Sequence, residues 1–374
     1  MSESASKLRV LARPAFENRR DNPYNWLLYS GLRARGVLVE EYGARNLFCG
    51  RYDVCHVHWP ESTFNASLLE ALATTQALLR ALDWLRGRGT KLVWTAHNLR
   101  AHERRFAREE EAFWTQFVAR VDGFIALSEA SLELTRQRFP ELARRPAFVV
   151  PHPHYRGEYP DGVARSQARV RLGLGQDAQV VLFFGRVLEY KNVPELIRTV
   201  RALPRSVDGR EVTLLVAGRP YDRGTEQAVL RAADGDQRIR LHLRFVPRED
   251  AQLFFRAANL VALPYREILN SGSAVLGLGF DRPVLMPRLG AGQELERLIG
   301  REWVHLYDEL RPESLCEALA RARALPPVTD GRQLAPLDPS AVVSGTLSAY
   351  QSLVLPALPS RLRELSALSA GVYP

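Results

Sequence analysis

Two cations follow a strand-like run in the second half of the chain. The run is Val180–Phe184, and its apolar, β-branched and aromatic residues predict a strand buried on both faces. Gly185 ends the run, Arg186 and Lys191 follow, and a helical pattern begins at Val193. This order predicts a phosphate site at the carboxyl end of a parallel sheet. On spacing alone, a solvated loop with two surface cations explains the pattern equally well, although only three of the 51 basic residues are Lys.

A second segment offers backbone N–H groups and hydroxyls at a helix start. Ser271, Gly272 and Ser273 precede an apolar helical pattern over residues 274–280. Such a start can hold phosphate oxygens, and the alternative is plain capping, which needs only one Ser. The polar candidates beside it at the predicted strand ends are Arg219, Tyr265, Glu267 and Asn270, of which Glu267 could accept hydrogen bonds from a ribose or sugar hydroxyl.

The first half of the chain places imidazoles and carboxylates after its predicted strands. They are His56, His58, Glu61, His97, Asn98, His102 and Glu103. An imidazole or carboxylate facing a cleft could remove a proton from a hydroxyl group, whereas a single His is more often structural. The spacing of His97 and His102 does not match a zinc-binding helix, so we predict no metal site.

The alternation of strand and helix patterns predicts the fold class. Strand-like runs alternate with helical patterns through both halves of the 374 residues, which predicts an α/β protein with two doubly wound parallel sheets facing a cleft. We expect one domain over residues 1–155 and a second over 163–340, joined by the Pro- and Gly-rich segment 151–162. A helical segment, 341–374, is expected to cross back to the first domain.

Composition limits the partners. The net charge of +9 and the pI of about 9.7 suit anionic ligands, but no motif or basic–aromatic cluster indicates nucleic acid. We find no apolar run long enough for a membrane span, no signal-peptide pattern and no C-x-x-C among three cysteines. We therefore expect a cytoplasmic protein.

A basic cluster, Arg100–Arg108, precedes Phe113 and Trp114. On a helix these residues could form a face for an anionic membrane, at the inner side of the plasma membrane. The alternative is an ordinary solvated helix face, because several Glu residues are interspersed.

The order of the motifs resembles the GT-B glycosyltransferases. The segment 184–192, Phe-Gly-Arg-Val-Leu-Glu-Tyr-Lys-Asn, looks like the strand and loop of their large family-four group, and further matches are Thr95-Ala-His-Asn, Leu127-Ser, Val150-Pro-His, Ala217-Gly and Arg282-Pro-Val-Leu before Gly290. The resemblance implies two Rossmann-like domains, a nucleotide sugar held mainly by the second, and a donor diphosphate bound by Arg186 and Lys191.

One departure from that group points to a subgroup. The usual pair of glutamates spaced E-x7-E is broken, because the second position falls near Leu276. Residues 265–273, with Asn22-Pro-Tyr24 and the segment 95–103, look more like bacterial exopolysaccharide glycosyltransferases. Some of those are described as GDP-mannose-dependent β-mannosyltransferases acting on lipid-linked oligosaccharides. This resemblance implies an inverting reaction with a base in the first domain, for which Glu61, His97 and Glu103 are the candidates.

The expected activity is sugar transfer from GDP-mannose or a UDP-sugar to a hydroxyl of a glycan or lipid-linked oligosaccharide, without cofactor or metal. The alternatives are a non-catalytic nucleotide-sugar-binding protein and a nucleotide-sugar epimerase. The acceptor candidates are Asn22, Tyr24, His58 and His154. The donor candidates are Gly185, Arg186, Lys191, Arg219, Tyr265, Glu267, Asn270, Ser271, Gly272 and Ser273.

Overall fold

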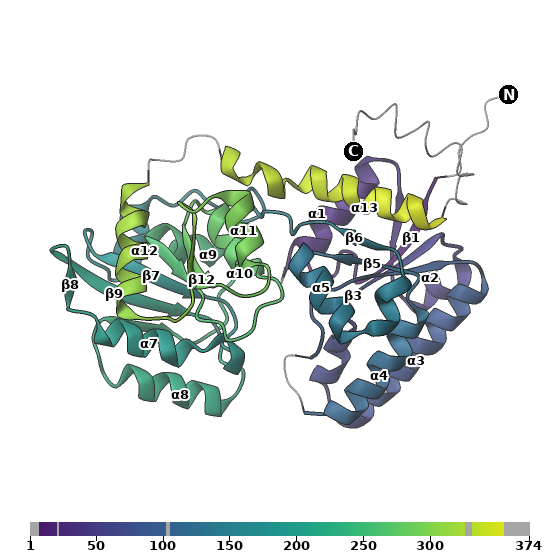
Figure 1. The fold of residues 1–374 in the computed structure, drawn as a ribbon, viewed down its shortest axis with the longest axis horizontal. Helices are drawn as coiled ribbons and strands as arrows, with labels where there is room; N and C mark the ends of the chain where they lie inside the picture. Colours follow the sequence, from purple (N-terminus) through teal and green to yellow (C-terminus); the bar gives the residue numbers. More distant parts are fainter. Residues whose placement is uncertain (1–6, 21, 102–104, 326–330, 355–374) are drawn as a thin grey trace.

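A computed structural model describes residues 7–20, 22–101, 105–325 and 331–354. The chain forms two lobes that lie side by side, each built on a parallel sheet with helices on both faces (Figure 1). The predicted α/β class, with two doubly wound sheets, is therefore confirmed. Among the described residues, no helix combines the length and apolar character that crossing a membrane requires.

The N-terminal lobe contains a six-stranded parallel sheet in the order β2-β1-β3-β4-β5-β6. Its strands are short, and their apolar residues alternate between two cores, one on each face of the sheet. The strands are β1 (Arg9–Arg13), β2 (Leu38–Glu41), β3 (Val54–His58), β4 (Lys91–Thr95), β5 (Gly123–Ala126) and β6 (Ala147–Val149).

Helices cover both faces of this sheet, with α1 and α13 on one side and α3 and α4 on the other (Figure 1). The helices are α1 (Tyr24–Ala34), α2 (Ala44–Cys49), α3 (Leu68–Gly87), α4 (Ala107–Arg120) and α5 (Glu129–Arg138), with the 3-10 turns η1 (Pro60–Asn65) and η2 (Pro140–Arg144).

The possible membrane face around Arg100–Arg108 does not have Phe113 and Trp114 at its edge, because both side chains are buried. Phe113 and Trp114 of α4 are buried in the core between α4 and the sheet, where they contact other aromatic rings. Arg100 forms an ion pair with Glu267 of the other lobe. The aromatic edge proposed for this face therefore belongs to the interior, and His102 and Glu103 lie outside the described residues.

The C-terminal lobe has the strand order β10-β9-β7-β11-β12-β13, with a short β8 antiparallel to β9. We did not predict β8 or β13, which are brief and carry polar residues. The strands are β7 (Gln179–Phe184), β8 (Ser206–Val207), β9 (Arg210–Ala217), β10 (Ile239–His242), β11 (Leu260–Ala262), β12 (Val284–Pro287) and β13 (Val304–Tyr307).

The helices from α6 to α12 surround this second sheet, and α13 follows them in the chain. They are α6 (Arg165–Arg171), α7 (Val193–Ala202), α8 (Arg223–Ala233), α9 (Arg248–Ala257), α10 (Gly272–Gly279), α11 (Gly292–Ile299), α12 (Pro312–Ala324) and α13 (Pro339–Val354), with the 3-10 turns η3 (Glu189–Lys191) and η4 (Arg332–Leu337).

The strand order reverses beside the first strand of each lobe, between β1 and β3 and between β7 and β11. Ligands of doubly wound sheets bind at the carboxyl ends of the strands at such points. The loops after β7 and β11 carry the predicted phosphate-binding residues, and the loop after β3 begins with Trp59 and η1. The fold therefore places the candidates of each lobe at that lobe's switch point.

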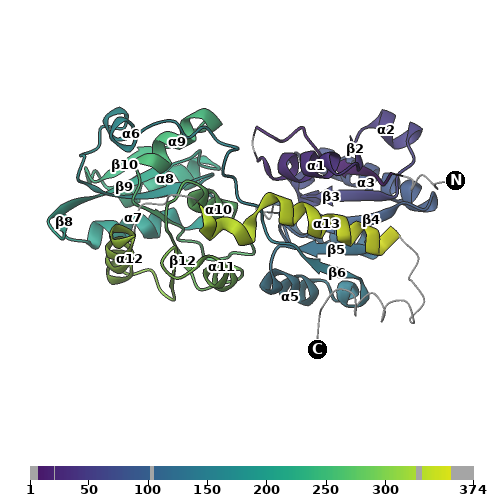
Figure 2. The same ribbon diagram turned by 90° about the horizontal axis from the view of Figure 1, so that it is seen from above.

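The helix α13 leaves the C-terminal lobe and lies along α1 of the N-terminal lobe (Figures 1 and 2). The two helices approach closely at Gly31, where an added Cβ would lie 2.4 Å from Cγ2 of Val343. Because Val is branched at Cβ, it has little freedom to move away. Gly31 is therefore a packing requirement for the seating of α13.

We predict that Gly31→Ala destabilises the protein by about 1–3 kcal/mol through overpacking against α13. The midpoint of urea unfolding measures this change. Gly87→Ala is the matched control, because it lies in the last position of α3 and a Cβ there meets nothing within 4 Å. A midpoint of Gly31→Ala that equals that of the control would contradict the prediction.

Candidate functional site

Two glycines bring the loops after β7, β9 and β11 together. A Cβ on Gly185 would lie 3.4 Å from Oγ of Ser273 and 3.5 Å from Nζ of Lys191, so these three residues converge. Gly185 has a φ of +121°, and Gly218, at +153°, approaches so closely that its Cβ would lie 1.9 Å from the Gly185 carbonyl oxygen. The positive φ disfavours a side chain at both positions, and at Gly218 a Cβ would also collide with the backbone of Gly185.

The side chain of Lys191 is buried, and its Nζ lies 5.5 Å from the centre of the Tyr265 ring. Burial, and secondarily the charge of Arg186, lowers the pKa of Lys191 to about 8. The ammonium group is therefore poorly solvated in the free protein. An anion beside it would restore the favourable environment of the charge.

Arg186 belongs to the same loop. Its guanidinium lies 5.0 Å from the centre of the Tyr221 ring, which follows β9. The backbone supports this arrangement, because Val187 N–H donates to the Arg219 carbonyl (3.0 Å). The side chain of Arg219 is exposed. The lobe therefore presents a buried cation and an arginine at its switch point.

The start of α10 completes this side of the site. Ser271 is the N-cap, and its Oγ accepts from the N–H of Ala274 (3.1 Å). Burial raises the pKa of Tyr265 to about 12, against the opposing effect of the Ser273 and Ser271 hydroxyls. The N-terminal end of α10, with its partial positive charge, therefore faces the same space as Lys191.

Two further donor candidates connect the lobes. Glu267 is paired with Arg100, and Nδ2 of Asn270 donates to the Ala96 carbonyl (3.3 Å). The structure places both residues against the loop after β4 of the N-terminal lobe. These two side chains therefore bridge the lobes, whereas Gly185, Lys191 and Ser273 converge within one of them.

In the N-terminal lobe, a chain of hydrogen bonds runs through three buried imidazoles. It connects Thr95 Oγ1 to His56 Nε2 (2.8 Å), His56 Nδ1 to the Tyr29 hydroxyl (3.0 Å), that hydroxyl to His58 Nε2 (2.6 Å), and His58 Nδ1 to His97 Nε2 (2.9 Å). We call these five residues the imidazole chain. Burial lowers the pKa of all three imidazoles, that of His56 to about 3.

Neutral imidazoles and a hydroxyl can satisfy this chain in two ways. In one, His97 donates to His58 and each following group donates toward Thr95; in the other, every donor is reversed. Tyr350 of α13 also bonds Nδ1 of His56 (2.6 Å). The C-terminal helix therefore contributes directly to a buried polar network beneath the site.

His97, at one end of the imidazole chain, lies within an aromatic cluster. The Trp59 ring is stacked on it with centroids 4.0 Å apart, and Tyr24 contacts it edge-on at 4.7 Å. Trp59 has a left-handed backbone with a φ of +44°, which is uncommon for a bulky residue. Such conformations concentrate at functional sites.

Glu61 follows Trp59 and is buried. Its Oε1 accepts from Nδ2 of Asn98 (2.7 Å), while Oε2 is buried and has no hydrogen-bond partner among the residues that the structure describes. Burial raises the pKa of this carboxyl to about 7. A buried carboxyl that retains an unused acceptor and titrates near neutrality is suited to proton transfer.

The acceptor candidates reach the start of α10 through His152, which we did not predict. Tyr155 O–H donates to Asn22 Oδ1 (2.8 Å), and His152 Nε2 lies 3.6 Å from the Cβ position of Gly272. The ring of Tyr24 contacts both His152 and His58. The Pro-His-Pro-His pattern of the linker was the sequence signal for a site residue here, but it did not distinguish His152 from His154. The structure places His154 against η4, where its N–H donates to the Leu337 carbonyl (2.8 Å).

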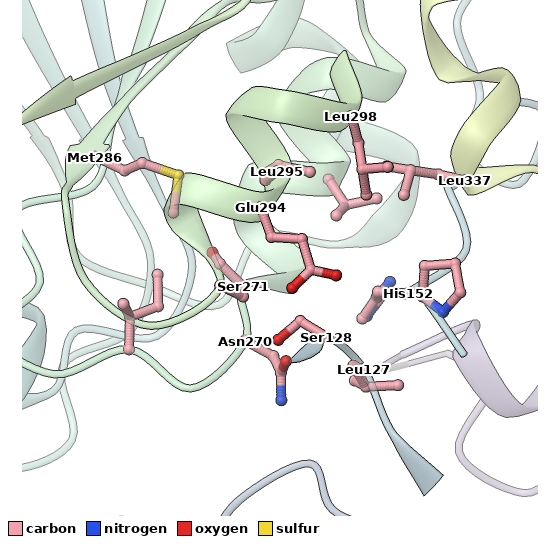
Figure 3. A pocket seen from close by; sticks show the side chains of 14 residues that line it. Leu127, Ser128, His152, Asn270, Ser271, Met286, Glu294, Leu295, Leu298 and Leu337 are labelled. Atoms are coloured by element: carbon pink, nitrogen blue, oxygen red, sulfur yellow. The ribbon is translucent and has the colours of Figure 1, made fainter. Parts of the chain in front are cut away.

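An open pocket lies between the lobes next to Ser271 (Figure 3). We call it the interlobe pocket. Figure 3 shows Glu294 and His152 directed into it, and Glu294 Oε2 accepts from the N–H of Glu129 at the start of α5 (2.8 Å). Its walls are otherwise mainly apolar, with Ile268, Val275, Met286, Leu295, Leu298, Leu127 and Leu337. Among the described residues, no group of three His, Cys, Asp or Glu side chains is arranged to hold a metal ion.

Comparison with known proteins connects this geometry to a chemistry. Residues 3–153 match the family described as Glycosyltransferase Family 4. The chain is 30% identical over 330 residues to the GDP-mannose:glycolipid 4-beta-D-mannosyltransferase of Xanthomonas campestris pv. campestris, covering 86% of each protein. It is 31% identical over 236 residues to the D-inositol 3-phosphate glycosyltransferase of Salinispora arenicola, covering 54% of this chain and 52% of that protein.

Two solved structures show the same fold. Sucrose-phosphate synthase from Thermosynechococcus elongatus has a TM-score of 0.59 at 16% identity and covers 98% of this chain and 100% of its own. The Anabaena protein HepE in complex with UDP-glucose has a TM-score of 0.59 at 15% identity and covers 92% and 98%.

We predict that Glu61→Gln stabilises the protein at pH 8 by up to about 3 kcal/mol and leaves it unchanged near pH 4. The raised pKa means that ionisation favours the unfolded chain as the pH rises from about 4.5 to 7, and Gln imitates the protonated acid. Urea unfolding at the two pH values measures this difference.

The exposed Glu226→Gln is the control, and it should show no such pH-dependent gain. If the Glu61→Gln variant were no more stable than the wild type at pH 8, the carboxyl would not be destabilised by burial.

Proposed function

Because this chain belongs to the GT-B glycosyltransferases of the family-four type, we propose that it transfers mannose from GDP-mannose to a hydroxyl of a lipid-linked glycan. The relative that is similar over most of the chain carries GDP-mannose, a glycolipid and a β-linkage in its name. The observation that carries the proposal is the convergence of Gly185, Lys191 and Ser273 in one lobe. A buried acid of raised pKa, Glu61, lies at the switch point of the other lobe.

The C-terminal lobe would bind the donor diphosphate. Lys191, Arg186 and the N-terminus of α10 would face its oxygens and stabilise the charge that develops on the leaving GDP. Binding would also restore a normal environment to the buried Lys191. Since fixed cations and a helix terminus supply the positive charge, we propose that the reaction requires neither metal nor cofactor.

The N-terminal lobe would activate the acceptor. The mannose of GDP-mannose is α-linked, so a β-product requires inversion at C1. The acceptor oxygen forms a bond to C1, the bond from C1 to the diphosphate oxygen breaks, and the hydroxyl proton passes to a base. We propose Oε2 of Glu61 as that base, because its pKa lies near the working pH. His97, whose pKa burial lowers well below its ordinary value, is the weaker candidate.

The acceptor and the place of reaction follow from the same relative. We propose a cytoplasmic protein that makes peripheral contact with the inner face of the plasma membrane, where a lipid-linked glycan would be reached. Asn22, Tyr24 and His58, which share a cluster with His97 and His152, would line the path of the acceptor sugar.

We predict that GDP raises the thermal unfolding temperature in the presence of EDTA and that UDP does so much less, because a ligand of the native state stabilises it by mass action. Arg186→Ala and Lys191→Ala should abolish the shift and lower turnover by roughly 100-fold or more. Differential scanning fluorimetry and a GDP-release assay provide the two measurements.

The exposed Arg240→Ala, on the edge strand β10, should retain both the shift and the turnover. A shift by UDP alone would contradict the GDP assignment. Unchanged turnover in both site variants would contradict the donor site itself, and release of GDP without a glycosylated product would contradict transfer.

We predict that turnover at saturating substrate rises with pH through an apparent pKa near 7, because the base must be deprotonated. Glu61→Gln should remove that limb and reduce turnover by at least about 100-fold. The measurement is the pH profile of kcat between pH 5 and 9.

His97→Gln tests the competing base in the same profile. Its limb near pH 7 should remain, since Glu61 is intact. If His97→Gln removed the limb while Glu61→Gln retained it, the two roles would have to be exchanged.

A further inference from the structure

The outer face of α2 and α3 carries large apolar side chains that the fold leaves exposed. Leu69 is 80% exposed, Phe48 63%, Trp84 48% and Leu72 40%. Three of them lie on α3 at spacings that bring them to one side of the helix, and Phe48 joins them from α2, with its ring 6.4 Å from that of Trp84. We call Phe48, Leu69, Leu72 and Trp84 the α3 face.

Arginines accompany the α3 face. Arg80 is exposed on the same side of α3, and the guanidinium of Arg88 lies 5.3 Å from the centre of the Trp84 ring. Arg45 and Arg51, at either side of Phe48, are also exposed. Of the nearby acids, Asp83 receives two hydrogen bonds from Arg120 (2.8 Å each).

This combination suits the interface of an anionic bilayer. Tryptophan and phenylalanine favour the boundary between lipid and water, and arginine side chains reach phosphate groups while their stems cover apolar surface. A helix of 20 residues is about 30 Å long, so the leucines and the aromatic pair can contact the bilayer at widely separated points.

The position of α3 connects this surface to the site. The helix starts two residues after η1, which carries Glu61, and lies on the outside of the N-terminal lobe (Figures 1 and 2). We propose that the α3 face is the membrane-docking surface, which inserts its apolar side chains among the head groups of anionic phospholipids. The inference deepens the proposed function, since it identifies how the protein would reach a lipid-linked acceptor.

Cys49 supplies a reporter next to Phe48. It is exposed, whereas Cys55 is buried and Cys316 is half-buried. We expect the full chain with Cys316→Ser, labelled at Cys49 with an environment-sensitive dye, to show a blue-shifted emission with vesicles of equimolar phosphatidylcholine and phosphatidylglycerol. A dye at Leu230→Cys, in a chain with Cys49→Ser and Cys316→Ser, should report no change, because Leu230 is an exposed leucine of the other lobe.

Flotation of the unlabelled chain measures binding. The triple variant Phe48→Ser, Leu69→Ser, Trp84→Ser should lower the bound fraction by roughly tenfold or more, and Arg80→Glu with Arg88→Glu should lower it similarly. Leu230→Ser and Arg240→Glu are the matched controls and should float like the wild type. Both sets of variants should retain the thermal shift by GDP, so that a failure of the donor site is distinguished from a failure of docking.

Flotation of the triple variant at the wild-type level would overturn the proposal, as would equal binding to vesicles of phosphatidylcholine alone. The wild type could instead bind neither kind of vesicle and form a dimer in light scattering. If the triple variant were then monomeric, the proposal would be overturned, and the partner of the α3 face would be a second copy of the chain.

Discussion

The site depends on keeping a positive charge where little water reaches it. Lys191 is buried beside Arg186, and burial together with the like charge weakens its hold on a proton. The glycines at 185 and 218 permit this close approach, because both have a positive φ and a Cβ at Gly218 would collide with the Gly185 carbonyl. The arrangement is unfavourable until an anion binds, so relief of the buried charge would add to the binding free energy of an anionic ligand.

At its own switch point, the N-terminal lobe buries an acid and not a cation. Glu61 is a buried acid whose second oxygen has no partner in the described part of the chain, and burial keeps the neighbouring imidazoles neutral. The imidazole chain also receives a contact from the C-terminal helix, because Tyr350 of α13 bonds to His56 although the two residues are far apart in the sequence. Seating α13 against α1 therefore both closes the core and completes the polar network beneath the acceptor side.

The local signals of the sequence predicted the strands and their loops well. The apolar run Val180–Phe184 forms most of β7, as predicted, whereas the helix predicted over residues 274–280 starts earlier, at Gly272. What could not be predicted depends on residues far apart, such as the partner of Glu267 or the contact of His152 with Gly272. The possible aromatic edge of a membrane face at Phe113 and Trp114 is contradicted, because the spacing of these residues with Phe117 and Val118 places them on a buried helix face.

Two kinds of contact join the lobes, and they differ in the free energy needed to separate them. Toward the pocket, polar contacts connect them: Arg100 with Glu267, Asn270 with the Ala96 carbonyl, and Glu294 with the N–H of Glu129. The ion pair between Arg100 and Glu267 is exposed and contributes little to stability, so separating these two residues costs little free energy. Behind the pocket, α13 and Tyr155 belong to an apolar cluster that continues from one lobe into the other. Separating the lobes on the pocket side would leave that cluster intact. This difference between the two sides favours a hinge beside α13, about which the lobes would open at the pocket.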